Sequence, residues 1–423
     1  MQRITVNLRT AYVFFTMSGM SKQKILIVGG GFGGIKAALE LGNDDISKKL
    51  DITLVSDQTT FRYYPALYRT ATGGAVAGSS IPLKTILSDT PVKVVQGTAE
   101  TIDRKAKTLA LTGGEVLSYD TLILGLGVVT NYFGIAGMEE FSYSIKSFDA
   151  IKRFKQHLHE QIEDDRRPDL NYVIVGAGPT GIELAGALPD YLREIMNNHG
   201  VRHKAVHIDL IEAAPRLLPR MPKGTSRKVA THLRRHGVKL YVKSAVQGVT
   251  AQDLTVNGKP IKSHTVLWTA GVTNHPFFKN NAFMLTPRGK VATNLYLEAE
   301  DNIFVIGDNA NTPYSGMAQT AMHDGEYVAH VIARRLENKE PKSYRIVKPI
   351  TIIPVGERWA TVLWDKVRLY GIVGWALREL ADLVAFADYE PWWKAGRQWL
   401  SGFEEEEACA VCNKAEHHEM VDK

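Results

Sequence analysis

The chain has 423 residues, of which 44% are hydrophobic and 23% charged, a composition typical of a globular protein. At roughly one domain per 150 residues, this length predicts two or three domains. The net charge of +6 is spread along the chain and forms no basic tract, which argues against nucleic acid as a partner. The two cysteines, Cys409 and Cys412, both lie in the C-terminal tail, so a reducing compartment is expected and no disulfide framework supports the core.

The segment before the first predicted strand, residues 1–22, is expected to be a disordered extension. Its apolar run, Ala11 to Phe15, is too short to span a membrane, and Met20 is an alternative start to Met1. No apolar run of about eighteen residues occurs anywhere in the chain. The sequence therefore predicts no membrane-spanning helix.

The strongest local pattern is the apolar run Lys24 to Val28, which meets a glycine cluster and continues as a helical pattern to Leu41. Gly29, Gly31 and Gly34 occupy the three positions of GxGxxG. One glycine permits the tight turn, one lets the backbone approach a pyrophosphate, and one lets the helix pack closely on the strand. The pattern predicts a dinucleotide site at a helix N-terminus.

The same strand, loop and helix recur in Tyr172 to Leu188, with Gly176, Gly178 and Gly181 in the loop. A single GxGxxG is weak evidence, because glycine-rich turns occur in unrelated folds. The repeat raises its weight, and two such sites predict two bound dinucleotides.

Each unit has a candidate ribose-binding residue at the end of its second strand. The first strand of this kind, Asp51 to Val55, ends at Ser56 and Asp57, and the alternative for Asp57 is an ordinary turn residue. The second, His207 to Glu212, ends on an acid that suits the hydroxyls of NADH. Arg216 is nearby and leaves NADPH open.

The region from Phe61 to Ile86 is aromatic and then glycine-rich, and it contains no cysteine. Thiol–disulfide relay and sulfide oxidation are therefore excluded, because both need thiols in the core. Further on, the apolar strands Val266 to Val272 and Asn302 to Asp308 close on glycine, and Asp308 is placed to bind a hydroxyl-rich chain. Strands are predicted at Pro349 to Val355 and Trp359 to Leu363, with helix from Val367 onward.

The order of these motifs resembles that of the two-dinucleotide-fold flavoproteins, and within them the type II NADH:quinone oxidoreductases. The resemblance covers about residues 23 to 400 and rests on the segments ILIVGGGFGG, GAGPTGIEL, EAAPRLLP, WTAGV, IFVIGDNA and AQTAMHDGE. It implies an α/β fold with two Rossmann-like domains, one for FAD and one for NADH, plus a small C-terminal membrane-associating helical segment. It also implies hydride transfer from NADH to flavin and delivery of two electrons to a quinone of the menaquinone or ubiquinone type, without proton pumping.

The resemblance also divides the chain. It implies an FAD-binding domain in two parts, an NADH-binding domain between them, a C-terminal domain and an acidic tail. These cover 23–148 and 273–345 for FAD, 149–272 for NADH, 346–403 for the C-terminal domain and 404–423 for the tail.

Site residues follow from the resemblance, position by position. FAD is expected to be held by Gly29, Gly31, Gly33, Gly34, Ser56, Asp57, Gly307, Asp308 and Ala318. NADH is expected to be held by Gly176, Gly178, Gly181, Glu212 and Gly271. Catalysis is expected to involve Glu183, Gln319 and His323.

Three positions depart from the family pattern. Ser56 stands where the family commonly has Asp, Glu or Asn, and Arg69 replaces a family acid. His323 replaces the second glutamine of AQxAxQ, which makes it a candidate proton donor to quinone, the alternative being an ordinary surface histidine. For Glu183, the matched family carboxylate lies near the flavin, and the alternative is an acid favoured by the helix dipole.

A membrane-binding surface is predicted near the C-terminus. Apolar residues from Leu369 to Ala387 follow helical spacing, with Arg378, Glu379 and Asp382 on the other face. After Pro391, a second helix is expected to carry aromatic side chains at the lipid headgroup level: Trp392, Trp393, Trp399 and Phe403. This predicts a peripheral protein on the cytoplasmic face of the cell membrane. The alternative is a helix packed on its own protein or in a homodimer.

Other functions remain open. A soluble NAD(P)H-dependent reductase of a ferredoxin- or rubredoxin-like protein would share both nucleotide domains without needing an apolar C-terminal surface, and an NADH sensor would need only binding. In the tail, Cys409, Cys412, His417 and His418 have the side-chain types of a zinc site. A single CxxC without a second half of standard spacing is insufficient, so no metal is assigned.

Overall fold

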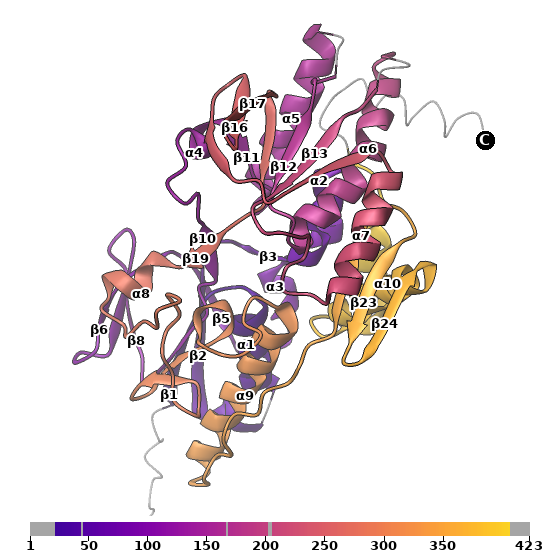
Figure 1. Cartoon of the computed structure of the whole chain (residues 1–423). Helices are drawn as coiled ribbons and strands as arrows, with labels where there is room; N and C mark the ends of the chain where they lie inside the picture. The colour runs from indigo at the N-terminus through magenta and orange to yellow at the C-terminus, as the bar shows by residue number, and fades with distance from the viewer. Residues whose placement is uncertain (1–21, 44, 166–167, 202–204, 407–423) are drawn as a thin grey trace, which may run out of the picture.

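Two parallel sheets form the frame of the protein, and each contains one of the glycine-loop strands (Figure 1). The computed structural model describes residues 22–43, 45–165, 168–201 and 205–406. The first sheet has the order β20-β21-β9-β1-β2-β5 and the second the order β11-β18-β12-β13-β14. Strands of the first sheet are β1 (Gln23–Val28), β2 (Leu50–Ser56), β5 (Lys93–Gln96), β9 (Thr121–Leu124), β20 (Glu298–Glu300) and β21 (Ile303–Val305). Strands of the second are β11 (Ser142–Tyr143), β12 (Tyr172–Val175), β13 (Ile208–Glu212), β14 (Val238–Val242) and β18 (Thr265–Trp268).

The glycine-loop strands lie inside their sheets, which is why they are apolar on both faces. β1 pairs in parallel with β2 on one side and β9 on the other, and β12 pairs in the same way with β13 and β18. The chain leaves β1 toward β2 and later returns on the opposite side at β9. A crevice therefore opens at the carboxyl end of the strand, where α/β sheets of this kind bind their ligands.

Two helices that are far apart in the sequence cover one face of the first sheet. These are α1 (Phe32–Asn43), which follows the first glycine loop, and α9 (Ala318–Leu336) (Figure 1). Their backbones touch at two glycines: a Cβ added at Gly325 would lie 2.2 Å from the Gly33 carbonyl oxygen. Residues 23–148 and 273–345, which the sequence assigns to FAD and which we call the FAD-type unit, thus pack directly on each other.

Helices α5 (Phe148–Asp165), α6 (Pro179–Asn198) and α7 (Lys223–Arg235) belong to the second unit. An antiparallel ribbon of β10 (Val128–Thr130) and β19 (Val272–Asn274) lies where the chain enters and leaves that unit. Two three-stranded antiparallel sheets were not predicted from the sequence. They consist of β6 (Ala99–Asp103), β7 (Thr108–Leu111) and β8 (Val116–Ser118), and of β15 (Val246–Val249), β16 (Asp253–Val256) and β17 (Lys259–Lys262).

The C-terminal part begins with a three-stranded sheet, of which the sequence predicted two strands. β22 (Thr351–Pro354) and β23 (Ala360–Trp364) are confirmed, but the helix predicted from Val367 is wrong for its first five residues. Val367–Gly371 forms β24, paired antiparallel with β23 after a tight turn in which Asp365 has a φ of 50°. Leu369 therefore lies in a strand and is not part of the apolar helical stripe.

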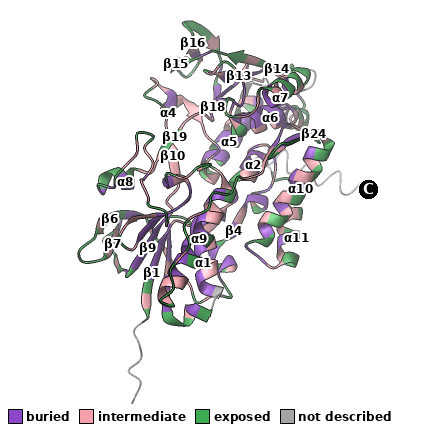
Figure 2. Ribbon diagram, turned by 60° about the horizontal axis from the view of Figure 1, so that its bottom comes forward, coloured by how far each residue is buried: buried purple, intermediate pink, exposed green. Residues whose placement is uncertain are grey.

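Two helices follow this sheet, α10 (Ile372–Ala387) and α11 (Trp392–Ser401), and they pack on each other and on the FAD-type unit. α10 has one buried and one exposed side (Figure 2). As predicted, its charged residues Arg378, Glu379 and Asp382 are buried, whereas large apolar residues such as Ile372 and Leu380 are exposed. After α11, the start of the acidic tail is tied to the body, because Ala75 donates to the Glu404 carbonyl and Glu406 to that of Gly73. Among the described residues no helix is long and apolar enough to cross a membrane.

The α1–α9 contact generates a prediction about stability. Gly325→Ala adds a methyl group against the Gly33 carbonyl, and overpacking of this kind typically destabilises by about 1–3 kcal/mol, more than the roughly 1 kcal/mol that alanine gains over glycine in a helix. The thermal unfolding midpoint should therefore fall. Gly396→Ala in α11 is the matched control, since a Cβ there meets nothing within 4 Å, and it should raise the midpoint. A midpoint that rises in both variants would contradict the close helix contact.

Candidate dinucleotide and redox site

The first and third glycines of each loop are required by the fold itself. Gly29 and Gly176 have φ values of 118° and 104°, a conformation that side chains with a Cβ avoid. A Cβ on Gly34 would lie 2.0 Å from the Gly29 carbonyl oxygen, and one on Gly181 would lie 1.9 Å from that of Gly176. The two loops therefore share one backbone geometry.

The middle glycine of each loop has a different reason. A Cβ on Gly31 or Gly178 would meet no protein atom within 4 Å. The fold leaves this space open at the N-terminus of α1 or α6, where unpaired N–H groups and the helix dipole favour an anion. Gly33 differs again, because its Cβ would lie 2.8 Å from the Ala321 carbonyl oxygen of α9, so its small size serves helix packing.

A cavity of about 270 Å³ lies beside the first loop, at the carboxyl ends of β1, β2 and β9. Ser56 and Asp57 line it together with Gly29 to Gly31, and Gly125 to Val129 form another part of the wall. Ser56 is buried and its hydroxyl accepts a bond from the Gln58 N–H at 3.2 Å, whereas Asp57 is exposed. Asp57 is thus the side chain better placed to meet a ribose hydroxyl.

The segment after β21 is held by a carboxylate that the sequence analysis missed. Gly307 donates its N–H to Asp324 at 2.9 Å, and the Tyr344 hydroxyl donates to the same side chain at 2.6 Å. Burial raises the pKa of Asp324 to about 6. Asp308 accepts from the Gly316 N–H at 2.8 Å, and Ala318 is the first residue of α9. The only signal for Asp324 was an acid inside an otherwise well-packed helix.

At the second loop, Glu212 is held in place by two backbone groups. Its carboxylate accepts from the Ala177 N–H and the Ala214 N–H, both at 2.8 Å. Arg216, which had left NADPH open, is turned away: its guanidinium donates to the Met221 carbonyl at 2.7 Å and to the Ser226 hydroxyl at 2.6 Å. The charge at the end of β13 is therefore negative.

Gly271 lies where the chain passes from β18 to β19. Its φ is 71°, and a Cβ there would lie 2.6 Å from the Asn131 carbonyl oxygen. Its neighbour Ala270 contacts the second loop, because a Cβ on Gly176 would lie 2.8 Å from the Ala270 nitrogen. The structure thus places Gly271 beside the second glycine loop.

Glu183 lies in the second turn of α6, near charged residues of α2 (Leu67–Ala71) and α10. Burial raises its pKa to about 8; Arg378 and Arg69 act against this rise and Asp382 adds to it. No hydrogen bond or ion pair to its carboxyl occurs among the residues that the structure describes.

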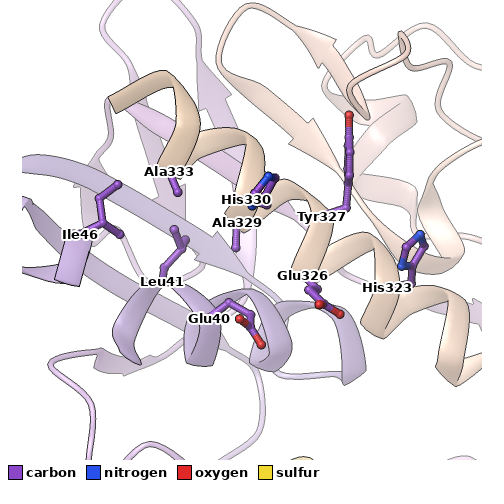
Figure 3. Close-up of a pocket in the computed structure, with 9 residues that line it drawn as sticks. All are labelled: Glu40, Leu41, Ile46, His323, Glu326, Tyr327, Ala329, His330 and Ala333. Atoms are coloured by element: carbon purple, nitrogen blue, oxygen red, sulfur yellow. The ribbon is translucent and has the colours of Figure 1, made fainter. Parts of the chain in front are cut away.

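The other two predicted catalytic residues lie on α9. The Gln319 side-chain oxygen accepts from the Ile350 N–H at 2.9 Å. His323 Nε2 lies 2.9 Å from the Arg345 carbonyl oxygen, so it donates there, and the ring packs on Tyr344. His323 lines a separate pocket of about 290 Å³ between α1 and α9, whose lining includes neither the glycine loop nor Glu183 (Figure 3).

That pocket also contains Glu40, Glu326 and His330 (Figure 3). Even so, no group of three or more His, Cys, Asp or Glu side chains suited to a metal ion occurs in the part of the chain that the structure describes. The four tail residues considered for zinc, Cys409, Cys412, His417 and His418, lie outside the described residues.

Comparison with known proteins defines the class. Residues 23–325 match the family model described as pyridine nucleotide-disulphide oxidoreductase, and the chain belongs to this family. A relative, the type II NADH:quinone oxidoreductase of Staphylococcus haemolyticus, is 26% identical over 358 residues, which cover 79% of this chain and 88% of the relative.

Solved structures share the fold. The NDH2 of Plasmodium falciparum, in complex with NADH, aligns with a TM-score of 0.78 at 17% identity, covering 90% of this chain and 97% of that one. The sulfide:quinone oxidoreductase of Aquifex aeolicus aligns with a TM-score of 0.73 at 21% identity, covering 89% and 92%. A shared fold does not imply shared chemistry. The chain has only two cysteines, both in the tail, whereas sulfide oxidation needs thiols in the core.

The family implies FAD and a nicotinamide dinucleotide, and the residues fit both. Each glycine loop leaves open the space that a pyrophosphate needs, and each has an acid at the end of the second strand of its unit. The first loop and the Gly307–Asp308 segment would hold FAD, and the second loop with Glu212 would hold the nicotinamide dinucleotide.

The different roles of the glycines generate a test of the cofactor site. Gly31→Leu places its side chain in open space, so the fold should persist while the pyrophosphate is excluded. Steric conflict of about 1–3 kcal/mol corresponds to a roughly fivefold to 150-fold loss of FAD affinity, which the flavin absorbance per chain measures. Gly34→Ala is the contrasting variant, because its methyl group meets the Gly29 carbonyl and should lower the unfolding midpoint. Full flavin content in Gly31→Leu would contradict the assignment.

Proposed function

We propose that the protein oxidises NADH, through FAD, and reduces a membrane quinone of the menaquinone or ubiquinone type, without pumping protons. The name of the type II relatives supports this proposal, and one structural observation carries it. That observation is the exposed apolar surface formed by α10 and α11, beside the charged residues near Glu183.

This surface is unusual for a monomeric protein. On α10, the large apolar side chains of the outward stripe are more than half exposed: Ile372, Val373, Leu380 and Val384. On α11 and just beyond it, the same is true of Trp392, Trp393, Leu400 and Phe403. Contiguous apolar patches on soluble proteins generally mark an interaction site, and tryptophans suit the headgroup region of a bilayer. We refer to these eight residues as the apolar C-terminal face.

Acidic residues weaken attraction to anionic lipid, and Asp388, Glu390 and the glutamates of the tail count against membrane binding. Glu390 is turned inward and only 9% exposed, so it does not face the lipid. Asp388 remains exposed at the end of α10, while Arg397 is exposed on α11. Glu404, Glu405 and Glu406 are also exposed just beyond α11. The exposed acids outnumber Arg397 at this surface, so apolar contact supplies the binding energy.

NADH is the proposed electron donor. The Glu212 carboxylate suits the ribose hydroxyls and would repel the 2′-phosphate of NADPH, while Arg216 is held by other partners. When bound, FAD supplies the chemistry of accepting a hydride and passing two electrons on. The chain's own residues orient both dinucleotides, and Glu183 holds the proton that the reduced quinone needs. The net reaction is NADH + H⁺ + quinone → NAD⁺ + quinol.

The first test of this function replaces two apolar residues of the apolar C-terminal face by polar ones and keeps both helices. Burial of each half-exposed apolar side chain contributes on the order of 1 kcal/mol, so Leu380→Gln with Val384→Gln should weaken binding to lipid vesicles by about tenfold or more. Reduction of a long-chain quinone in the vesicles should fall with it. Anaerobic bleaching of the flavin by NADH should be unchanged.

Leu295→Gln is the matched control, since Leu295 is 69% exposed but lies outside the C-terminal helices. It should bind vesicles like the unaltered protein. An unaltered protein that ignores vesicles and reduces an iron–sulfur protein faster than any quinone would contradict the proposal and favour the soluble reductase.

The nucleotide preference generates a second test. Glu212→Gln keeps one of the two backbone hydrogen bonds, through its amide oxygen, and removes the negative charge. The ratio of kcat/KM for NADH over NADPH should therefore fall, by about tenfold if the carboxylate contributes roughly 1.4 kcal/mol. Arg216→Gln should leave the ratio unchanged. Equal use of both nucleotides by the unaltered protein would show that the ribose contact is misplaced.

A further inference from the structure

The cavity beside the first glycine loop has one wall that the glycine motif does not account for. Thr60 and Arg62 of the short strand β3 (Thr60–Arg62) line this cavity. Successive side chains of a strand point to opposite sides, so these two share one side of β3. Phe61, between them, points the other way and is fully buried. β3 therefore presents polar side chains to the cavity and an apolar one to the core.

β3 is anchored at the N-terminus of α1 by aromatic contacts. The Phe61 ring meets the Phe32 ring edge-on, with centroids 5.0 Å apart, and the Tyr63 ring lies 5.9 Å from Phe32. Phe32 is the first residue of α1 and directly follows Gly31, the glycine at the open space. This packing places Arg62 in the same cavity as the loop that is expected to hold a pyrophosphate.

Arg62 brings a full positive charge to the cavity. Of the described residues that line it, Arg62 is the only lysine or arginine, and Asp57 is the only carboxylate. His275 lines the cavity as well, but burial lowers the pKa of its imidazole, so the ring is neutral at neutral pH. The permanent cation of this cavity is therefore Arg62.

The Arg62 guanidinium is held on one side and has donors to spare. Its Nη1 donates to the Lys146 carbonyl at 2.8 Å and lies 3.4 Å from the Tyr64 hydroxyl. Nε and Nη2 have no hydrogen-bond partner in the part of the chain that the structure describes. A planar guanidinium presents such donors as a fork that matches the oxygens of a phosphate group. Arg62 thus has both the charge and the free donors that a diphosphate requires.

We propose that Arg62 is a binding residue for the pyrophosphate of FAD and that it supplies a positive charge which the glycine loop lacks. This inference rests on the proposed function, because that function places FAD at the first loop. The pyrophosphate carries two negative charges, whereas the N–H groups and the dipole of a helix N-terminus offer only partial positive charge. A guanidinium in the same cavity adds a full charge and fixes the diphosphate by directed hydrogen bonds.

The bond to Lys146 is a structural contact, and the test must separate its loss from the loss of a ligand contact. Lys146 lies between β11 and α5, where the chain enters the second unit. An arginine that only tied β3 to this segment would support the shape of the cavity. Its removal would weaken all ligands of the cavity alike, whereas removal of a diphosphate contact weakens only ligands that carry a diphosphate.

The first measurement is the dissociation constant of FAD, obtained by diluting the full-length, FAD-loaded protein and reading the fluorescence of released FAD. Arg62→Gln should raise this constant by about tenfold to 100-fold, the loss expected for hydrogen bonds to a charged group. Arg62→Lys keeps the charge but not the fork, so its constant should lie between those of Arg62→Gln and the unaltered protein.

Arg334→Gln is the matched control. Arg334 is also partly buried and donates to a backbone carbonyl, that of Glu340 at 2.8 Å, but it does not line the cavity. Its replacement removes the same charge and a similar structural bond, so the dissociation constant of FAD should not change.

Displacement of FAD by its fragments identifies the group that Arg62 contacts. ADP carries the diphosphate and adenosine does not, and for each we measure the concentration that displaces half of the bound FAD. The ratio of these concentrations, ADP over adenosine, should rise by about tenfold in Arg62→Gln and stay constant in Arg334→Gln. Weaker FAD binding in Arg62→Gln with an unchanged ratio would show a structural contact only and overturn the inference.

The inference and the proposed function fail in different ways. An unaltered protein that carries FAD, with the same dissociation constant in Arg62→Gln, overturns the inference and leaves the function standing. An unaltered protein that binds no FAD overturns the function and the inference with it. The unfolding midpoint of each variant confirms that folded protein was measured.

Discussion

Close approach of backbone to backbone at the two glycine loops is the constraint on which the rest of the structure depends. The third glycine of each loop comes so near to the carbonyl of the first that one methyl group would overlap it. This contact brings the N-terminus of α1 or α6 to the carboxyl end of its strand. The open space at the middle glycine, the helix dipole and the acids after β2 and β13 all take their positions from it.

The C-terminal helices show how burial of charge can determine which way a helix faces. An apolar stripe on α10 would ordinarily be expected to face the protein core. It faces outward instead, because Arg378, Glu379 and Asp382 find a nearly complete set of partners in Tyr63, Pro65 and Arg69. Buried ion pairs are weak evidence for stability, but they discriminate between orientations, since the reversed helix would leave Arg69 without its partners Glu379 and Asp382.

Much of the fold was predictable because local patterns carry it. Apolar runs ending in glycine predicted β1, β12, β18 and β21, and the acid of the second unit was found at the end of β13. The small antiparallel sheets were not predicted, since their strands are short, half-exposed and defined by partners distant in the sequence. β24 was taken for helix because its apolar residues continue smoothly into those of α10, and only pairing with β23 separates the two.

For the candidate site, the sequence by itself determined the kinds of chemical group and their local geometry: two glycine loops, an acid at the end of β13 and two opposite faces on α10. Those properties depend on residues within a few turns of one another. The tertiary structure alone decided that Asp324 holds Gly307, that Arg216 is turned away from Glu212, and that Glu183 lies beside charges of α10. Such contacts join residues from different elements, and no local periodicity records which side chains a fold will bring together.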